Sequence, residues 1–527
     1  MSGSALREIA WIPLYSKGNT VEEYITVEEA LTRGAKDSTC EAVKTRSLLG
    51  GLGYEAGAVI RFLASIVAVA ERYRDPSIPR PAIDAAAVGK ALDLLEPYCD
   101  LYSEERPFMQ RRESPGSPLT KIAAEKVLPK NLSPTIPSTR SLIFWGLRTY
   151  PEVLSPAQAT LALISHHYYS PAGNSSYEGA KPQMGAPGLR WPGKDLTATE
   201  IISCLDELYP TLLLNIPQSW VEGTSLPAWA DRKREVSDER HELWRQTWSS
   251  NTAVANWDEE GNLIRAKDCG IPNSWYSPSQ GNKKESRTAW WDQRNRTDPF
   301  YLYRANDKGK KTMKRLDIGR DMTELAVSWI AEGNASALRN HLISPARLYS
   351  STDTDDLQEI VFLRHQMGGT GSSPSMRASE ALIADPHTWA PHEQVLEELL
   401  LITDTFLQLR GSLLYRFRGA YSGEQATEAV SYLPELKDLR GDANATFWRE
   451  VTPVFEELVT NSVIDNPTDE FIDRIVTEVV DATLRSYDLV THAYERQYIA
   501  QISTVRRILR IACRSIAKTV LSGEEDA

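Results

Sequence analysis

The stretch Arg364–Arg377, RHQMGGTGSSPSMR, marks the point at which the 527-residue chain changes character. Mixed sequence with short β-like runs, many prolines and most of the tryptophans precedes it, and almost uninterrupted helical periodicity follows from about His392. Gly368 and Gly369 lead into Gly371-Ser372-Ser373-Pro374-Ser375, and residues of these types form turns rather than packed cores. The stretch therefore predicts a turn or a hairpin tip.

Basic residues flank this tip. Arg364 and His365 precede the glycines and Arg377 follows the serines, so we expect positive charge beside backbone N–H groups that large side chains do not obstruct. This combination suits an anion or the phosphate backbone of a nucleic acid. The alternative is an ordinary flexible hairpin between two domains.

Helical periodicity is clearest after the tip. In the segment 395–417 apolar residues recur at three- and four-residue steps, which predicts an amphipathic helix. These residues are Val395, Leu396, Leu399, Ile402, Phe406, Leu409, Leu413 and Phe417. The same pattern continues over 423–432, 444–462 and 468–521. Four such helices are most simply packed as an antiparallel bundle.

The sequence thus predicts an α+β protein with two domains. We expect a large mixed domain of helices and small antiparallel sheets over residues 1–385, carrying the recognition loops, and a four-helix bundle over residues 386–527. Within the first domain, Thr197-Ala-Thr-Glu200 resembles a capping box and predicts a helix over Ile201–Leu214. The tryptophan-rich segment Trp220–Tyr303 predicts antiparallel strands and loops, with one amphipathic helix near Ser237–Trp248.

Composition narrows the class of protein. Hydrophobic residues make up 41% and charged residues 25% of the chain, as in ordinary globular proteins. No apolar run is judged long enough to span a bilayer and no secretory signal is evident, so we expect a cytoplasmic protein without membrane contact. Five scattered cysteines without a C-x-x-C pair argue against disulfides and against a cysteine zinc site.

The net charge of −12 argues against a protein that coats nucleic acid unaided, because such proteins are usually basic. Local basic surfaces remain compatible with it. On the last helix, four basic residues recur at four-residue spacing and form one stripe: Arg506, Arg510, Arg514 and Lys518. The stripe predicts either a solvated face paired with acidic neighbours or a surface that binds a partner.

Reaction centres are weak in this sequence. Asp353, Asp355 and Asp356 allow a metal-dependent hydrolase as an alternative, although these residues more simply cap the turn that follows them. The adjacent His166-His167 point in different directions on a helix and do not clamp one metal. We therefore favour a binding or scaffold subunit over an enzyme, and we expect no metal and no cofactor.

Several blocks, taken in order, resemble one family. They are Ala10-Trp11-Ile12-Pro13, Arg106-Pro107-Phe108-Met109-Gln110, Leu154-Ser155-Pro156-Ala157, the glycine loop around Ala172–Gly188, Thr211–Asn215, Leu226-Pro227-Ala228-Trp229 and Thr247-Trp248. With the hairpin and the helical bundle that follow, they are similar to CasA, the large subunit of the type I-E CRISPR surveillance complex Cascade. The Pro-Phe-Met-Gln block is the most distinctive, and the resemblance extends over nearly the whole chain.

This resemblance implies a subunit that does not catalyse a reaction. It would recognise the protospacer-adjacent motif (PAM) of duplex DNA from the minor groove, help to open the duplex and dock a helicase–nuclease. Its partners would be the other Cascade subunits with CRISPR RNA, double-stranded target DNA and that helicase–nuclease, and the isolated subunit would be a monomer.

The resemblance also assigns residues. The glycine loop would be Gly173-Asn174-Ser175-Ser176, the lysine finger Lys283 or Lys284, and the wedge Gly371-Ser372-Ser373-Pro374-Ser375. The loop at about Pro129–Ser138, with Lys130 and Asn131, would contact RNA or neighbouring subunits.

Three departures from the family pattern are visible. The wedge carries Ser-Ser-Pro-Ser where the family often has Asn-Gln, and the glycine loop has Asn and Ser where the family has more glycine. Only Cys269 stands where some members carry a zinc knuckle, so we expect no zinc here.

Overall fold

The computed structural model describes most of the chain. The described residues are 3–111, 127–134, 151–171, 185–190, 192–275, 284–305, 309, 311–344, 347–349, 357–370, 373–419, 431–464 and 467–522. They form two compact units. Unit 1 takes Met1–Ile318 and His341–Ala384, and unit 2 takes Gly319–Asn340 and Asp385–Ala527. The domain ranges expected from the sequence differ from these units chiefly in Gly319–Asn340, which the sequence-based division left in the first domain.

Unit 1 is the mixed part. Its α-helices are α1 (Val27–Thr32), α2 (Gly53–Ala70), α3 (Ala85–Leu95), α5 (Pro156–Tyr169), α6 (Leu208–Asn215), α7 (Gln218–Val221), α8 (Glu242–Thr247) and α9 (Lys284–Arg294). Short 3-10 turns are η1 (Thr45–Leu48), η2 (Glu71–Tyr73), η3 (Glu96–Tyr98), η5 (Pro129–Leu132) and η6 (Asn273–Trp275). Local signals set several of these ends. Ser155, for example, caps α5 in a capping box with Gln158, and Pro156 occupies the first helical turn.

Four small sheets complete unit 1. Their strands are β1 (Ile12–Tyr15) with β2 (Val21–Ile25); β4 (Thr197–Cys204), β9 (Glu359–Thr370) and β10 (Ser373–Ala384); β3 (Gln110–Arg111), β5 (Asn251–Trp257) and β6 (Leu263–Gly270); and β7 (Tyr303–Ala305) with β8 (Lys311–Met313). All pairs are antiparallel except the two-residue pair of β3 with β5. The expected fold class is confirmed, with this one parallel pair among the antiparallel ones.

The predicted helix over Ile201–Leu214 is wrong at its start. Thr197–Cys204 is strand β4, which pairs with β9 and is buried at all eight positions, and the helix α6 begins only at Leu208. Glu200, expected to cap that helix, instead points into the core. The β-branched Thr199, Ile201 and Ile202 suit a buried strand, and pairing with a distant strand outweighs the local capping signal.

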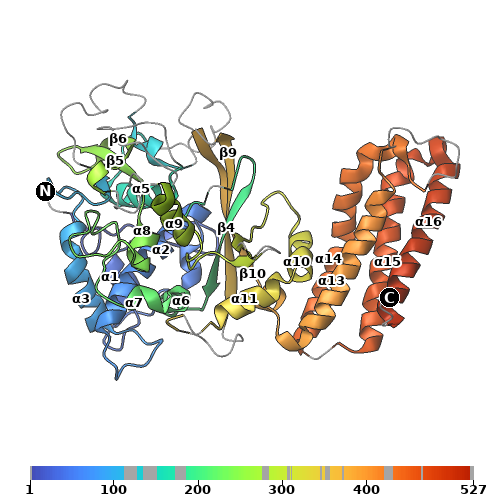
Figure 1. Cartoon of the computed structure of the whole chain (residues 1–527), viewed down its shortest axis with the longest axis horizontal. Helices are drawn as coiled ribbons and strands as arrows, with labels where there is room; N and C mark the ends of the chain where they lie inside the picture. Colours follow the sequence, from blue (N-terminus) through green and yellow to red (C-terminus); the bar gives the residue numbers. More distant parts are fainter. Residues whose placement is uncertain are drawn as a thin grey trace. The chain divides into compact units, whose positions relative to one another are not determined.

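Helix α2 is the centre of unit 1. Every residue of α2 except Glu55 is buried, and the helix contacts α3, α5, α6, β9 and β10. Figure 1 shows it surrounded by the other helices, with the long β9–β10 hairpin beside β4. By length and composition the segment Gly53–Tyr73 would suffice to cross a membrane, contrary to the sequence-based expectation, but 94% of its apolar window is buried inside the protein. Such burial is typical of a core helix.

A charged cluster is buried against α2. Arg61 donates from Nε to Glu200 of β4 over 2.6 Å and from both terminal nitrogens to Asp298 over 3.0 and 3.1 Å. All three side chains are almost fully buried. Burial by itself lowers the pKa of Arg61, but the charges of Asp298 and Glu200 outweigh it and the pKa stands well above the ordinary value.

Further polar groups complete this cluster. Tyr169 of α5 donates to Glu200 over 2.7 Å, and Nε2 of His365 in β9 lies 2.9 Å from the other side of that carboxylate. Arg190 donates to Asp298 over 2.9 Å. Burial raises the pKa of Glu200, yet Arg61 and His365 outweigh it and hold that pKa below the ordinary value. The cluster thus connects α2, α5, β4 and β9 and keeps the Glu200 carboxylate ionised.

Unit 2 is the helical part. It contains α10 (Met322–Ala331), α12 (Pro386–Trp389), α13 (Glu393–Tyr415), η9 (Pro434–Leu439), α14 (Arg440–Ile464), α15 (Asp469–Thr491), η10 (His492–Tyr494) and α16 (Glu495–Ser522), while α11 (Asn334–Leu342) crosses the division between the units. All eight apolar positions predicted for the segment 395–417 are buried. Most of the expected helix over 423–432, namely residues 423–430, lies outside the described residues. The stretch 468–521 divides at η10 into the two helices α15 and α16.

The long helices α13, α14, α15 and α16 contact one another and lie side by side in Figure 1, so the predicted four-helix bundle is confirmed. Helix α10 joins them. Its Thr323 hydroxyl lies 2.7 Å from that of Thr452, and its Glu324 accepts a hydrogen bond from Arg410 of α13 over 3.1 Å. These contacts explain why Gly319–Asn340 groups with the bundle despite its distance along the chain.

We expect Arg61→Met to lower the free energy of unfolding of unit 1 by about 3–5 kcal/mol, because the buried carboxylates of Glu200 and Asp298 lose the guanidinium that they share. Denaturant unfolding followed by tryptophan fluorescence measures it, since most tryptophans lie in unit 1. The control is Arg46→Met, whose exposed pair with Glu359 should contribute about 0–1 kcal/mol. Equal losses in the two variants would contradict the structural role of Arg61.

Stability should fall on mild acidification because of buried His167. Burial lowers the pKa of His167 to about 3, although its Nε2 lies 2.9 Å from the carbonyl oxygen of Thr247. Between pH 6.5 and about 3 the unfolded chain therefore binds a proton that the folded chain does not, which costs about 1.4 kcal/mol per pH unit. In His167→Gln the unfolding free energy, measured from pH 7 to 5, should decline less steeply; identical slopes would refute this assignment.

Candidate nucleic-acid interface

The predicted hairpin is present. In the register of β9 with β10, Ser373 lies opposite Thr370, Pro374 opposite Gly369 and Ser375 opposite Gly368. Gly369 has a φ of 75°, a left-handed conformation that glycine adopts at little cost. Gly371 and Ser372 lie outside the described residues. The other predicted wedge residues, Ser373, Pro374 and Ser375, are the first three positions of β10.

The basic residues beside the tip do not give it free positive charge, and that expectation is wrong. Arg364 is buried and ion-paired with Glu380 across the hairpin, and His365 is fully buried against Glu200. Arg377 is half exposed but ion-paired with Asp195. Strand alternation and cross-strand pairing therefore direct these charges to carboxylates rather than to a ligand.

The side chain of Arg377 also depends on a glycine. A Cβ atom at Gly368 would lie 2.3 Å from Nε of Arg377, so the arginine lies across a position that has room only for hydrogen. This packing holds Arg377 along the strand and toward Asp195. The result is a hairpin end made of small residues on a neutralised stem.

The hairpin is fastened to the start of α2. The hydroxyl of Ser379 in β10 accepts from the backbone N–H of Tyr54 over 2.8 Å and lies 2.9 Å from Nδ1 of His365. A Cβ atom at Gly53 would lie 2.5 Å from the carbonyl oxygen of Glu380, so helix and strand approach to backbone contact. Sequence reasoning missed this contact between the helix and the hairpin, and no local signal marks Ser379.

The segment around Lys130 lies beside the same hairpin. The backbone N–H of Met376 lies 3.4 Å from the carbonyl oxygen of Pro134, and the hydroxyl groups of Ser133 and Tyr54 are 3.3 Å apart. Lys130 and Asn131 belong to η5, in which Lys130 is half-buried. The structure therefore brings the proposed RNA- or partner-contacting segment to the wedge hairpin.

The glycine loop and most of the lysine finger fall outside the described residues. These are Gly173, Asn174, Ser175, Ser176 and Lys283, whereas Lys284 is the first residue of α9 rather than part of a loop tip. The flanks of both segments are described. Gly185, after the glycine loop, accepts a hydrogen bond from Arg294 of α9 over 2.9 Å, and Arg294 also donates to the carbonyl oxygen of Trp248.

A tryptophan cluster holds these flanks together. Trp290 and Trp291 of α9 pack edge-on against Trp248, with ring centroids 5.4 and 5.6 Å away, and the Arg294 guanidinium lies 5.4 Å from the Trp248 ring. A Cβ atom at Gly185 would lie 2.8 Å from Trp291. Gly185, after the predicted glycine loop, and α9, after the predicted lysine finger, thus pack on the same tryptophan cluster.

Contacts of Gly188 and Tyr169 connect this region to the hairpin. Gly188 donates its backbone N–H to the carbonyl oxygen of Tyr168 over 2.8 Å and lies directly on the Tyr169 ring. Tyr169 in turn contacts His365 of β9, with ring centroids 5.0 Å apart. Tyr169 therefore contacts both Gly188, which follows the predicted glycine loop, and His365 in the stem of the predicted wedge hairpin.

The basic stripe on α16 is only partly available. Arg506 makes a two-pronged ion pair with Asp488 of α15, with both distances 2.6 Å, so its first role is to join two helices of the bundle. Arg510, Arg514 and Lys518 are exposed.

Other predicted sites have different outcomes. Asp353, Asp355 and Asp356 lie outside the described residues. Among the residues that are described, no group of three or more His, Cys, Asp or Glu side chains is placed to hold a metal ion. His166 and His167 are buried, and burial lowers the pKa of His166 to about 4.

Comparison with known proteins concerns nearly the whole chain. The family model described as CRISPR-associated protein Cse1 (CRISPR_cse1) matches residues 8–486. No curated protein is similar enough in sequence to match.

Solved structures share the fold. CasA (Cse1) of Thermus thermophilus has 15% sequence identity and a TM-score of 0.60, with 99% of this chain and 100% of that chain covered. Cse1 of Thermobifida fusca has 14% identity and a TM-score of 0.61, with 99% of each chain covered. A chain of a CRISPR RNA-guided surveillance complex has 15% identity and a TM-score of 0.60, covering 97% of this chain and 99% of that one. At such identities the likeness shows the fold, and the family model, which spans most of the sequence, shows the family: the chain belongs to the CRISPR-associated protein Cse1 family.

Proposed function

We propose that this chain is the large, non-catalytic subunit of a type I-E CRISPR RNA-guided surveillance complex. In this role it recognises the PAM in duplex DNA, starts strand separation and recruits the helicase–nuclease. Membership of the Cse1 family and the likeness to a chain of a surveillance complex support the assignment. Its partners are the other subunits with CRISPR RNA, and no lipid contact is part of the proposal.

The observation that carries the proposal is the fastening of the β9–β10 hairpin. A wedge has to resist the load of two base pairs that close against it, and unstacking one step costs a few kcal/mol. Ser379 and His365 connect the stem of the hairpin to the start of α2 and to the buried ion cluster by hydrogen bonds. Small residues at the tip fit between bases more easily than large ones.

The arginines of the hairpin stem are ion-paired, and this determines how the proposed wedge acts. Because Arg364 and Arg377 are paired with Glu380 and Asp195, the hairpin opens DNA by its shape rather than by attracting phosphates. Attraction then comes from the neighbouring elements, namely Lys283 and Lys284 with the glycine loop Gly173–Ser176 in the minor groove, where a few donors suffice for its degenerate code. Target sequence is read by the guide RNA, so an acidic subunit is sufficient.

The double variant Lys283→Ala/Lys284→Ala should weaken binding of the reconstituted complex to PAM-containing duplex by at least about tenfold. Each lysine lost should also reduce the salt dependence by about one counterion. Gel shifts at several salt concentrations measure both effects. Binding of single-stranded target should stay unchanged, and Lys36→Ala/Lys90→Ala, two exposed lysines of unit 1, is the matched control. Equal losses on duplex and single strand would reject PAM recognition by these lysines.

Replacing Ser372, Ser373 and Pro374 by glycine should impair opening of the duplex, because the turn loses its stiffness. Association with a fully paired target should slow about tenfold or more, whereas a target already unpaired beside the PAM should bind as the unaltered complex does. Stopped-flow fluorescence of a base analogue next to the PAM reports opening. A variant that opens paired DNA at the normal rate would show that the hairpin is not the wedge.

A further inference from the structure

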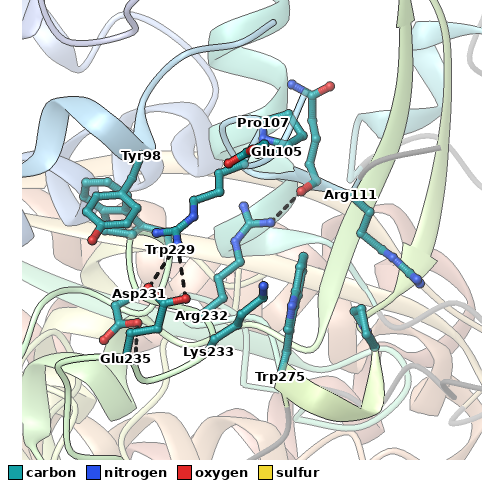
Figure 2. A pocket seen from close by; sticks show the side chains of 14 residues that line it. Tyr98, Glu105, Pro107, Arg111, Trp229, Asp231, Arg232, Lys233, Glu235 and Trp275 are labelled. Carbon is teal, nitrogen blue, oxygen red and sulfur yellow. Dashed lines mark hydrogen bonds and ion pairs between the residues drawn. The ribbon is translucent and has the colours of Figure 1, made fainter. Parts of the chain in front are cut away.

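A pocket of about 270 Å³ opens in unit 1 away from the hairpin. Its walls come from the Arg106–Gln110 block, from residues 229–235 and from η6, with Tyr98 at one end (Figure 2). The block that carries the most distinctive part of the family resemblance therefore lines a cavity. Nothing in the proposed PAM contacts uses this cavity.

The acidic residues of the pocket are largely engaged. Asp231 accepts backbone N–H groups of Glu235, Val236 and Ser237 over 2.8, 3.1 and 2.8 Å, so its carboxylate holds a turn. Glu235 receives the guanidinium of Arg106 over 3.1 and 3.2 Å at the rim. Arg111 donates to the carbonyl oxygen of Gly270. The basic residues Arg232 and Lys233 therefore face the cavity, together with the exposed carboxylate of Glu105.

Arg232 is a half-buried basic residue of the pocket. It donates to the backbone carbonyl oxygen of Gln110 over 2.6 Å, and its guanidinium lies 4.8 Å from the ring of Trp275. Among the described residues no carboxylate lies within ion-pair distance of it. Burial lowers the pKa of Arg232 to about 10, which still leaves it charged at neutral pH. The other N–H groups of this guanidinium can donate hydrogen bonds to a bound anion.

Aromatic surface lies beside this charge. Figure 2 shows the Trp275 ring next to Arg232 and Lys233, while Trp229 and Tyr98 form the opposite side of the cavity. Pro272 and Ala230 add further apolar surface. A flat apolar group with an attached anion matches these walls, since aromatic rings stack on planar ligands and an arginine fork binds phosphate.

We propose that this pocket binds a single nucleotide, with the phosphate at Arg232 and Lys233 and the base against Trp275. A pocket at the small end of ligand-binding cavities suits one nucleotide rather than a longer strand. The exposed Glu105 at its edge disfavours an acidic peptide with several negative charges more than a ligand with a single phosphate. The proposal is independent of PAM recognition. The nucleotide is either free or the phosphorylated end of a strand.

Calorimetric titration of the full chain tests the proposal, with AMP, orthophosphate, adenosine, and a dinucleotide with or without a 5′-phosphate as probes. AMP should bind saturably and more tightly than orthophosphate or adenosine. Lys233→Glu should weaken AMP by about tenfold or more, and Trp275→Leu should weaken AMP but not orthophosphate. Lys36→Glu, an exposed lysine in the loop after α1, should leave binding unchanged.

The dinucleotides distinguish the two sources of ligand. Binding of the 5′-phosphorylated form as tightly as AMP identifies a strand end, and binding of AMP alone identifies a free nucleotide. Because Lys233 is exposed, the variant Lys233→Glu should fold as the unaltered protein does. Absence of saturable AMP binding, equal affinity for orthophosphate, or equal effects of Lys233→Glu and Lys36→Glu would overturn the proposal.

Discussion

The burial of one guanidinium, that of Arg61, constrains the rest of unit 1. A cation in the middle of a core helix is tolerated only if carboxylates surround it, and Glu200 and Asp298 supply them from distant parts of the chain. Glu200 then fixes β4, and through His365 it fixes β9. The arrangement of helix, sheet and hairpin follows from satisfying one set of buried charges.

The same constraint determines what kind of surface the hairpin presents. Among the described residues of its stem, Arg364, His365 and Arg377 are used for contacts within the protein. The ion pair with Asp195 both holds the Arg377 side chain and neutralises its charge. In the proposed function, the charge that attracts nucleic acid is therefore assigned to separate elements, which agrees with a net charge of −12.

Basic residues in this acidic chain fall into two groups. Some, such as Arg294 and Arg506, serve the fold by holding backbone carbonyl groups or neighbouring helices. Others, such as Arg232 beside Trp275, combine charge with aromatic surface in a cavity. The sequence does not separate these groups, because a guanidinium is functional or structural according to the acceptors that the fold brings to it.

The sequence by itself determined the helical bundle and the hairpin. Apolar periodicity from Val395 to Phe417 and the Gly/Ser turn are local signals, and residues near each other in the chain satisfy them. Only the tertiary structure decided that Thr197–Cys204 is a strand, that Arg377 is neutralised and that Arg232 faces a cavity. Asp195 stands 182 residues before its partner Arg377, and β4 needs β9 to become a strand. Such pairings depend on chain segments that meet only after folding, so no local pattern records them.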